Sequence, residues 1–223
     1  LKDKDMLTQF VRELTPLLKE QGLVVSMDVT FRSSSENWSM FYDRKALSEV
    51  VDYIAVMAYD QHWASSPTAG SVAELSWVEN GLKRILEEVP KEKVLLGLPF
   101  YTRIWKEEVK NGVVKLSSSA VSMGAVERII RDRKLEVIWN EESGQNYVEY
   151  KDGNAKCMIW IEDDESINLK ASLVHKYDLA GAASWRKGFE TEDIWMVLRD
   201  TLKIKQSYAQ WANTFSDSDA AHK

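Results

Sequence analysis

The chain has 223 residues, of which 44% are hydrophobic and 29% are charged, a composition typical of globular proteins rather than disordered or repetitive ones. Its net charge of -6 and pI near 5.3 argue against a nucleic-acid partner, because surfaces that neutralise phosphates are basic. The longest apolar run, residues 53–59, is far shorter than the roughly 20 residues that a membrane span requires. We therefore expect a soluble globular protein that binds neither nucleic acid nor membrane.

Metal and cofactor chemistry lack their usual signals in this sequence. A single cysteine, Cys157, excludes an internal disulfide and a multi-cysteine zinc site. The histidines, His62, His175 and His222, form no H-E-x-x-H pair. The glycines form neither G-x-G-x-x-G nor G-x-x-x-x-G-K-[ST]. We expect no metal and no cofactor.

The first half of the chain alternates between helical and strand patterns. Residues 6–18 have apolar residues at helical spacing, with a kink expected at Pro16 and an end at Gly22. A valine-rich strand is predicted at 23–30 and a short helix at 44–50. The apolar run at 53–59 is typical of a strand covered on both faces. After a loop at 60–73, the pattern predicts a helix at 74–89 and a strand at 94–98.

Beyond Tyr101 the pattern changes to that of an antiparallel unit. Strands are predicted at 113–116 and 137–139, a helix at 122–133, and a hairpin of strands 147–150 and 156–161 around Asp152-Gly153. The alternation then resumes with a helix at 164–177, a strand at 181–185 and a helix at 192–204. This order indicates an α/β fold with four parallel strands and an α+β insertion before the fourth. Periodicity alone leaves open a small doubly wound sheet or half of an eight-stranded barrel.

The residues that follow the predicted parallel strands are the candidates for function, because sites of both folds lie at the carboxyl ends of strands. They comprise Asp28, Thr30, Tyr59, Asp60, Tyr101, Arg103, Trp185 and Arg186. No serine or cysteine among them is paired with a histidine, which disfavours acyl transfer. Aromatic rings pack on the apolar faces of sugars, while carboxylates, phenols and guanidinium groups bond hydroxyls and amides. The set therefore predicts a carbohydrate ligand.

Four segments resemble glycoside hydrolase family 18, in the family's order and spacing. Residues 51–60, VDYIAVMAYD, resemble its sixth barrel strand, V-D-[YF]-[IV]-x-[VL]-M-x-Y-D, and 96–103, LGLPFYTR, resemble its seventh, G-[LIV]-P-x-Y-[GT]-R. Residues 162–166, EDDES, with Lys170 are similar to the D-D-x-x-S-[IL]-x-x-K that closes the insertion of chitinase-type members. Residues 181–185, GAASW, resemble the eighth strand. The resemblance extends over residues 24–204.

The resemblance implies the C-terminal half of a (β/α)8 TIM barrel, strands five to eight, with an inserted small α+β domain. The expected divisions are a partial barrel at 1–101, the insertion at 102–178, the final barrel strand and helix at 179–205, and a flexible tail at 206–223. The family's acid motif, D-x-x-D-x-D-x-E, is absent, and the chain opens at Leu1 without methionine. We therefore expect a fragment whose general acid lies upstream and which alone is inactive or nearly so.

The resemblance also implies the chemistry. Family 18 enzymes hydrolyse β-1,4 bonds next to N-acetylglucosamine with retention, and the acetamido oxygen of the substrate serves as nucleophile. By this resemblance Tyr59 bonds the acetamide and Asp60 holds the reactive sugar. The predicted substrate-binding residues are Trp185, which stacks on the sugar, Tyr101 and Arg103, which position hydroxyls, and Met57, Asp28, His62 and Trp63.

Softer signals point to a subgroup. Residues 60–63, DQHW, 66–73, SPTAGSVA, and 185–190, WRKGFE, resemble bacterial spore-associated and cell-wall-lytic members more than eukaryotic chitinases. The implied substrates are chitin oligomers or peptidoglycan and spore cortex. The implied location is extracellular, in the cell wall or the spore.

Structural interpretations stand beside these functional ones. Tyr59 and Trp185 are also ordinary core residues, Asp60 is also a loop cap, Arg103 also suits an ion pair with Asp28, and His62 and Trp63 suit the ordering of their loop. Glu162, Asp163 and Asp164 precede a helix, so we expect them to cap it rather than to supply an acid. Cys157 is expected to pack as a small hydrophobic residue.

Two other functions also remain open. One is a glycan-binding module of the same family without catalysis. The other is self-association, because four strands of an eight-stranded barrel leave two open edges.

Overall fold

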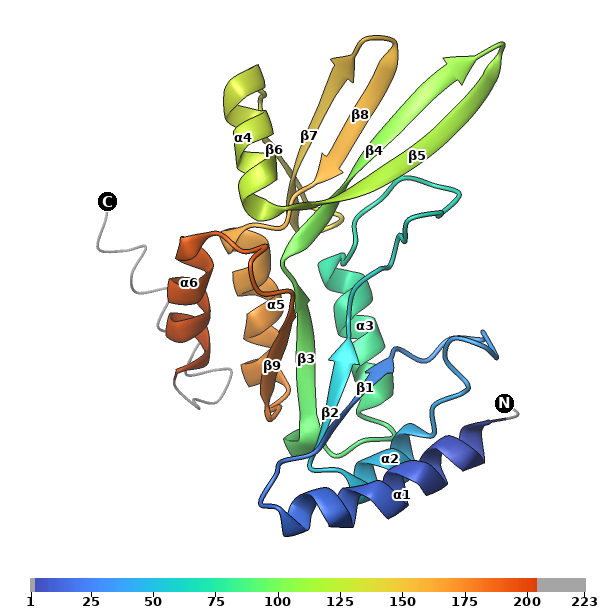
Figure 1. Cartoon of the computed structure of the whole chain (residues 1–223). Helices are drawn as coiled ribbons and strands as arrows, with labels where there is room; N and C mark the ends of the chain where they lie inside the picture. Colours follow the sequence, from blue (N-terminus) through green and yellow to red (C-terminus); the bar gives the residue numbers. More distant parts are fainter. Residues whose placement is uncertain (1–2, 204–223) are drawn as a thin grey trace.

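The computed structural model describes residues 3–203, and its centre is a four-stranded parallel sheet in the order β1-β2-β3-β9 (Figure 1). Its strands are β1 (Ser26–Thr30), β2 (Tyr53–Met57), β3 (Val94–Pro99) and β9 (Gly181–Trp185). Thr30 is in register with Met57, and Pro99 with Trp185. The carboxyl ends of the strands therefore lie along one edge of the sheet, and the predicted α/β class with four parallel strands is confirmed.

Helices cover one face of this sheet. They are α1 (Lys4–Glu20), α2 (Arg44–Val50), α3 (Leu75–Ile85), α5 (Asp164–Lys176) and α6 (Glu192–Leu202), with a short 3-10 helix at Lys91–Lys93. The main core lies between them and the sheet, where Val29, Ile54, Val56, Leu96 and Leu98 are fully buried. The opposite face presents the more exposed side chains of Asp28, Ala55 and Met57. The face under the helices thus forms the core, and the opposite face is more accessible.

An antiparallel sheet occupies the chain between β3 and β9, in the order β5-β4-β8-β7-β6. Its strands are β4 (Tyr101–Lys110), β5 (Val113–Ser122), β6 (Ile138–Asn140), β7 (Gln145–Asp152) and β8 (Ala155–Trp160), and α4 (Met123–Arg133) packs against it. The hairpin at Asp152-Gly153 is confirmed as the β7–β8 turn, with Gly153 at φ 63°. Cys157 is fully buried in this sheet's own core, as predicted.

Strand β4 is absent from the prediction, which placed Tyr101 and Arg103 in a connection after the third parallel strand. They begin a ten-residue strand that pairs with both β5 and β8. Its second half carries charges that find partners far along the chain: Lys106 Nζ lies 2.8 Å from Asp152 Oδ2. Such partners are invisible to local periodicity. The predicted helix at 74–89 is also too long, because α3 ends at Ile85.

The acidic cluster before α5 divides into two roles. Asp163 caps the helix as predicted: its carboxylate accepts from Ser166 N at 3.0 Å, and Ser166 Oγ accepts from Asp163 N at 3.0 Å. The capping prediction is wrong for Glu162, which is 1% exposed and lies 3.0 Å from Lys170 Nζ. Burial raises the pKa of Glu162 to about 7, while Lys170 and Ser166 act in the opposite direction. Its partner Lys170 is eight residues further along the chain, so Glu162 forms a buried ion pair instead of a surface helix cap.

Within residues 3–203, no helix has both the length and the apolar character needed to cross a membrane. The predicted tail at 206–223 lies outside the described residues.

Candidate functional site

Tyr59, Asp60, Tyr101 and Arg103 meet at the carboxyl edge of the parallel sheet. Tyr101 donates its hydroxyl hydrogen to Asp60 Oδ1 at 2.6 Å, and Arg103 Nη2 lies 3.5 Å from the same oxygen. The rings of Tyr59 and Tyr101 pack edge to face, with their centroids 6.2 Å apart and their planes at 77°. Residues 41 positions apart in sequence therefore form one cluster of two phenols, a carboxylate and a guanidinium.

Backbone geometry places two members of this cluster. Asp60 has φ 60°, a left-handed conformation that aspartate tolerates better than most residues, and it lies three residues beyond the end of β2. Gly97 of β3 gives the Tyr59 ring its space: a Cβ there would lie 2.3 Å from the Val56 carbonyl oxygen and 3.2 Å from the Tyr59 ring. A larger residue at position 97 would force β2 and the Tyr59 ring apart from β3.

Both phenols stay protonated at neutral pH. Burial, together with the nearby carboxylates of Asp28 and Asp60, raises the pKa of Tyr59 to about 12. Burial and the hydrogen bond to Asp60 raise the pKa of Tyr101 well above its usual range. Tyr101 donates its hydroxyl hydrogen to Asp60, and this hydrogen bond orients the carboxylate. Tyr59 keeps a hydroxyl that can donate to a ligand.

Arg103 forms an ion pair with a carboxylate, as one of its two interpretations expected, but the partner differs from the Asp28 given as the example. Asp60, rather than Asp28, is its carboxylate, and Arg103 Nη1 also lies 3.4 Å from Ser118 Oγ. The reason is β4, which carries Arg103 past the end of β2, whereas Asp28 lies in the middle of β1 on the opposite side of β2. Asp28 remains an exposed carboxylate that raises the pKa of Tyr59.

Trp185 and Met57 stand at the carboxyl ends of β9 and β2. Trp185 is the last residue of β9, its side chain is 55% exposed, and its peptide bond to Arg186 is cis. Its carbonyl oxygen accepts from Phe100 N at 2.7 Å, which ties it to the chain just before Tyr101. Met57 ends β2 and is partly exposed. A large flat ring is therefore presented at the same edge as the polar cluster.

His62 and Trp63 lie in the segment that follows Asp60, and the structure gives them different surroundings. His62 Nδ1 is 2.8 Å from Ser71 O, so His62 orders its own loop. Trp63 is 50% exposed, and its Nε1 donates to Ser65 Oγ at 3.1 Å. The segment reaches the middle of β5, where Ser118 Oγ donates to the carbonyl oxygen of Ala64 at 3.0 Å.

Trp38 is a candidate that the sequence reasoning missed. It is 74% exposed in the loop after β1, and its carbonyl oxygen accepts from Thr30 Oγ1 at 3.0 Å. The buried Arg44 guanidinium holds this loop by donating to Thr30 O at 2.8 Å and to Ser39 Oγ at 2.9 Å. The available signal was an isolated tryptophan in a serine-rich loop directly after a strand.

Comparison with known proteins identifies the family. The family model described as glycosyl hydrolases family 18 matches residues 1–189. The chain belongs to glycosyl hydrolase family 18. In the part of the chain described here, no group of three or more His, Cys, Asp or Glu side chains is placed to hold a metal ion.

The proteins similar to this chain include bacterial glycosylases and chitinases. The chain is 26% identical to the uncharacterized glycosylase YvbX of Bacillus subtilis, covering 91% of this chain and 58% of that protein. It is 24% identical to the cortical fragment-lytic enzyme of the same organism, covering 91% and 47%. The solved chitinase of Chromobacterium violaceum ATCC 12472 matches at TM-score 0.79 and 25% identity, covering 91% and 63%. The chain thus spans 47–63% of the length of these proteins.

Proposed function

We propose that this chain is the C-terminal half of the catalytic domain of a retaining, substrate-assisted glycoside hydrolase. Its substrate would be β-1,4-linked glycan that contains N-acetylglucosamine, as in chitin oligomers or in peptidoglycan and spore cortex. The observation that carries the proposal is the Tyr59, Asp60, Tyr101 and Arg103 cluster beside an exposed Trp185, in a family 18 chain. The names of the cortical fragment-lytic relatives favour action outside the cell, at the wall or the spore.

In this proposal the four parallel strands β1, β2, β3 and β9 are strands five to eight of a (β/α)8 barrel. The antiparallel sheet and α4 are the small insertion within residues 102–178, which divides residues 1–101 from 179–205; α5, at the end of that range, packs on the parallel sheet. Two features support this: the strands are parallel with helical crossovers, and the solved chitinase is similar over 91% of this chain but longer.

The geometry supports a role for each residue. In substrate-assisted hydrolysis the acetamido oxygen attacks the sugar's anomeric carbon, the glycosidic bond breaks, and a general acid protonates the departing oxygen. The Tyr59 hydroxyl, held neutral by its raised pKa, would donate to the acetamide, and Asp60 would hold the reactive sugar, oriented by Tyr101 and Arg103. Trp185 would stack beneath the ring. The printed sequence holds no D-x-x-D-x-D-x-E, so this chain alone lacks the acid.

That same absence favours one alternative, a glycan-binding module without catalysis. The exposed indoles of Trp63 and Trp185 would then be the recognition surface by themselves.

The proposal is tested by measuring reducing ends released from N-acetylglucosamine oligomers and from de-O-acetylated peptidoglycan. This chain is compared with a version that includes the sequence preceding Leu1 in its gene. We expect cleavage by the extended version only, because the acid must protonate the leaving oxygen. Cleavage by neither version would contradict the hydrolase, and sugar binding by both would support the module.

Binding is measured separately by quenching of tryptophan fluorescence with N-acetylglucosamine oligomers. We expect Trp185→Ala to weaken affinity by about tenfold, the size of a lost stacking contact. Trp139→Ala is the matched control, because Trp139 is 40% exposed on β6 of the antiparallel sheet. Equal affinities of the two variants would rule out stacking on Trp185.

A further inference from the structure

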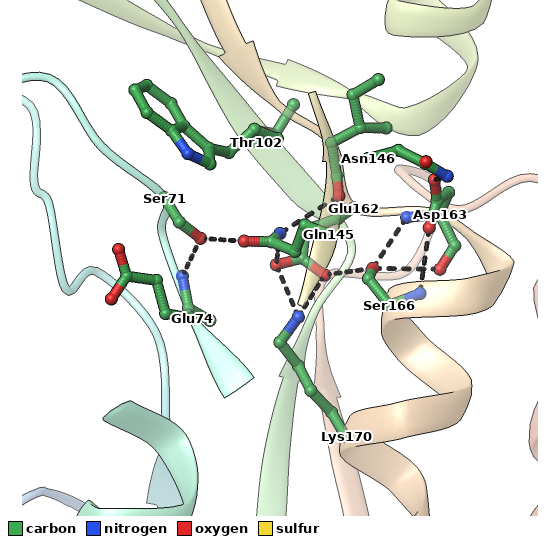
Figure 2. A network of polar contacts seen from close by, with 12 residues as sticks. Ser71, Glu74, Thr102, Gln145, Asn146, Glu162, Asp163, Ser166 and Lys170 are labelled. Atoms are coloured by element: carbon green, nitrogen blue, oxygen red, sulfur yellow. Dashed lines mark hydrogen bonds and ion pairs between the residues drawn. The ribbon is translucent and has the colours of Figure 1, made fainter. Parts of the chain in front are cut away.

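A fully buried polar network joins the segment after β2 to the antiparallel sheet and α5 (Figure 2). Its side chains are each at most 1% exposed and come from three separate parts of the chain: Ser71, Gln145, Glu162, Ser166 and Lys170. Burying polar groups costs free energy unless they are paired, so a network of this size must be satisfied throughout.

Glu162 and Lys170 form the anchor of this network. Lys170 Nζ lies 3.1 Å from Glu162 Oε1 and 3.0 Å from Oε2. Gln145 Nε2 donates to Oε1 at 2.9 Å, and Ser166 Oγ donates to Oε2 at 2.8 Å. Each carboxylate oxygen therefore accepts two hydrogen bonds, which is the condition under which a buried ion pair is tolerated.

The neighbours of Gln145 on this side determine the orientation of its side-chain amide, that is, which way its Nε2 and Oε1 point. A backbone carbonyl oxygen only accepts hydrogen bonds, and Gln145 Nε2 donates to that of Ile161 at 3.1 Å as well as to Glu162 Oε1. Gln145 Oε1 must then face the other side, where it accepts the hydroxyl hydrogen of Ser71. Ser71 Oγ in turn accepts from Ala73 N at 2.9 Å. The direction of each of these hydrogen bonds is determined.

The segment after β2 leaves the sheet at residues 60–62 and comes back beside them at residues 71–74, which include Ser71. We call these two stretches the outgoing and returning limbs of the segment. The two limbs are joined where Gln61 N donates to Val72 O at 2.9 Å and where the His62 ring meets Ser71 O. The Gln61 amide also accepts from Glu74 N at 2.9 Å and donates to the Glu74 carboxylate at 2.8 Å. Gln61, which follows Asp60, is thus hydrogen-bonded to the returning limb, and Gln145 bonds the same limb at Ser71.

We propose that Gln145 is a positioning residue, which through Ser71 fixes the segment that carries Asp60, His62 and Trp63 and so connects the antiparallel sheet to sugar recognition. The recognition part rests on the proposed function. The fixing of the segment rests on the hydrogen bonds alone. The antiparallel sheet then contributes to the site indirectly, since the Gln145 side chain bonds Ser71, Ile161 O and Glu162 rather than a residue of the Asp60 cluster.

Asn146 provides a matched control beside Gln145. It is the next residue on β7, and its amide donates to Asp163 Oδ2 at 2.9 Å and to Glu165 Oε2 at 2.7 Å, both at the start of α5. Replacing Asn146 therefore disturbs the same strand and helix without removing a bond to the segment after β2.

The test compares Gln145→Leu, Ser71→Ala, Ser71→Thr and Asn146→Leu in this chain, by hydrogen exchange of residues 61–74 and by oligomer binding. We expect Gln145→Leu and Ser71→Ala to speed exchange in 61–74 at least tenfold and to weaken N-acetylglucosamine oligomer binding about tenfold. Ser71→Thr keeps the hydroxyl and should restore both values. Asn146→Leu should lower the melting temperature and leave both values unchanged. Ser71→Ala removes only one hydroxyl, so it keeps the test valid if Gln145→Leu fails to fold.

The proposal is overturned if Ser71→Ala matches Asn146→Leu in exchange of 61–74. It is also overturned in its recognition part if exchange rises while affinity stays at the unsubstituted value. If the unsubstituted chain binds no oligomer, the recognition part is overturned for this chain, whereas the proposed function is decided by cleavage with the extended version. The exchange result still decides whether Gln145 fixes the segment.

Discussion

At the scale of single residues, the site depends on a phenol kept neutral by its surroundings. Burial and two carboxylates raise the pKa of Tyr59 to about 12, whereas an unfolded tyrosine ionises near 10. The folded chain therefore binds the Tyr59 proton more tightly than the unfolded chain between these values. The stability that this contributes is fully present below about pH 10 and is lost as the pH rises through about 12.

We expect Tyr59→Phe to flatten the fall of stability between pH 10 and 12, measured as the urea midpoint at each pH. In the phenolate absorbance at 295 nm, the difference between the unsubstituted chain and Tyr59→Phe should stay near zero through pH 10.5. In urea that unfolds both proteins, the same difference should appear near pH 10. A difference at pH 10 in the folded state would show that Tyr59 is not shielded.

The residue scale also shows where sequence reasoning stops. Tyr59, Asp60 and Tyr101 were recognisable because each follows a strand, and the structure does bring them together. Glu162 was misassigned because a carboxylate before a helix usually caps it. Its true surroundings depend on Gln145, which is 17 residues away and joins it only through pairing of β7 with β8.

At the scale of elements, short periodicities predicted the parallel strands and most helices, since each buries one face against the same core. Strand β4 escaped because its buried Ile104 and Trp105 are followed by charges at 106–108. Lys106 is compatible with the strand because Asp152, the last residue of β7, supplies its ion-pair partner. The residues of β4 suit a strand because of its pairing with β5 and β8, and a short stretch of sequence around β4 does not contain β8.

The start of α5 offers a test at this scale. Asp163 accepts from Ser166 N and is also bonded by Asn146 Nδ2 at 2.9 Å, so it joins the helix to β7. Asp163→Ala should lower the free energy of unfolding by about 1–2 kcal/mol, the cost of a lost helix cap. Asp163→Asn keeps one acceptor oxygen for Ser166 N but loses the bond from Asn146 Nδ2, so its loss should be smaller than that of Asp163→Ala without being zero. Urea unfolding of both variants measures this, and equal losses would mean that the charge matters more than the cap.

At the scale of the whole molecule, the parallel sheet has two outer strands, β1 and β9, each paired on one side only within residues 3–203. Unpaired strand edges with nearby apolar surface favour association with another chain. The groove between β9 and α6 has a volume of about 350 Å³ and is lined by Leu98, Ala182 and Trp195, among others. In the proposed barrel these edges would face the other four strands.

We therefore expect this chain alone to self-associate, as a dimer that pairs its open edges, at micromolar concentration in light scattering. A lysine on an edge strand opposes such pairing, so Ala183→Lys on β9 should shift the mass toward the monomer. Ala120→Lys puts the same charge on β5, the edge of the antiparallel sheet, and should leave the dimer intact. The version extended upstream of Leu1 should be monomeric, because its own strands would pair with β1 and β9. A monomeric mass for the unsubstituted chain would show that its edges do not associate, and equal effects of the two lysines would place the contact elsewhere.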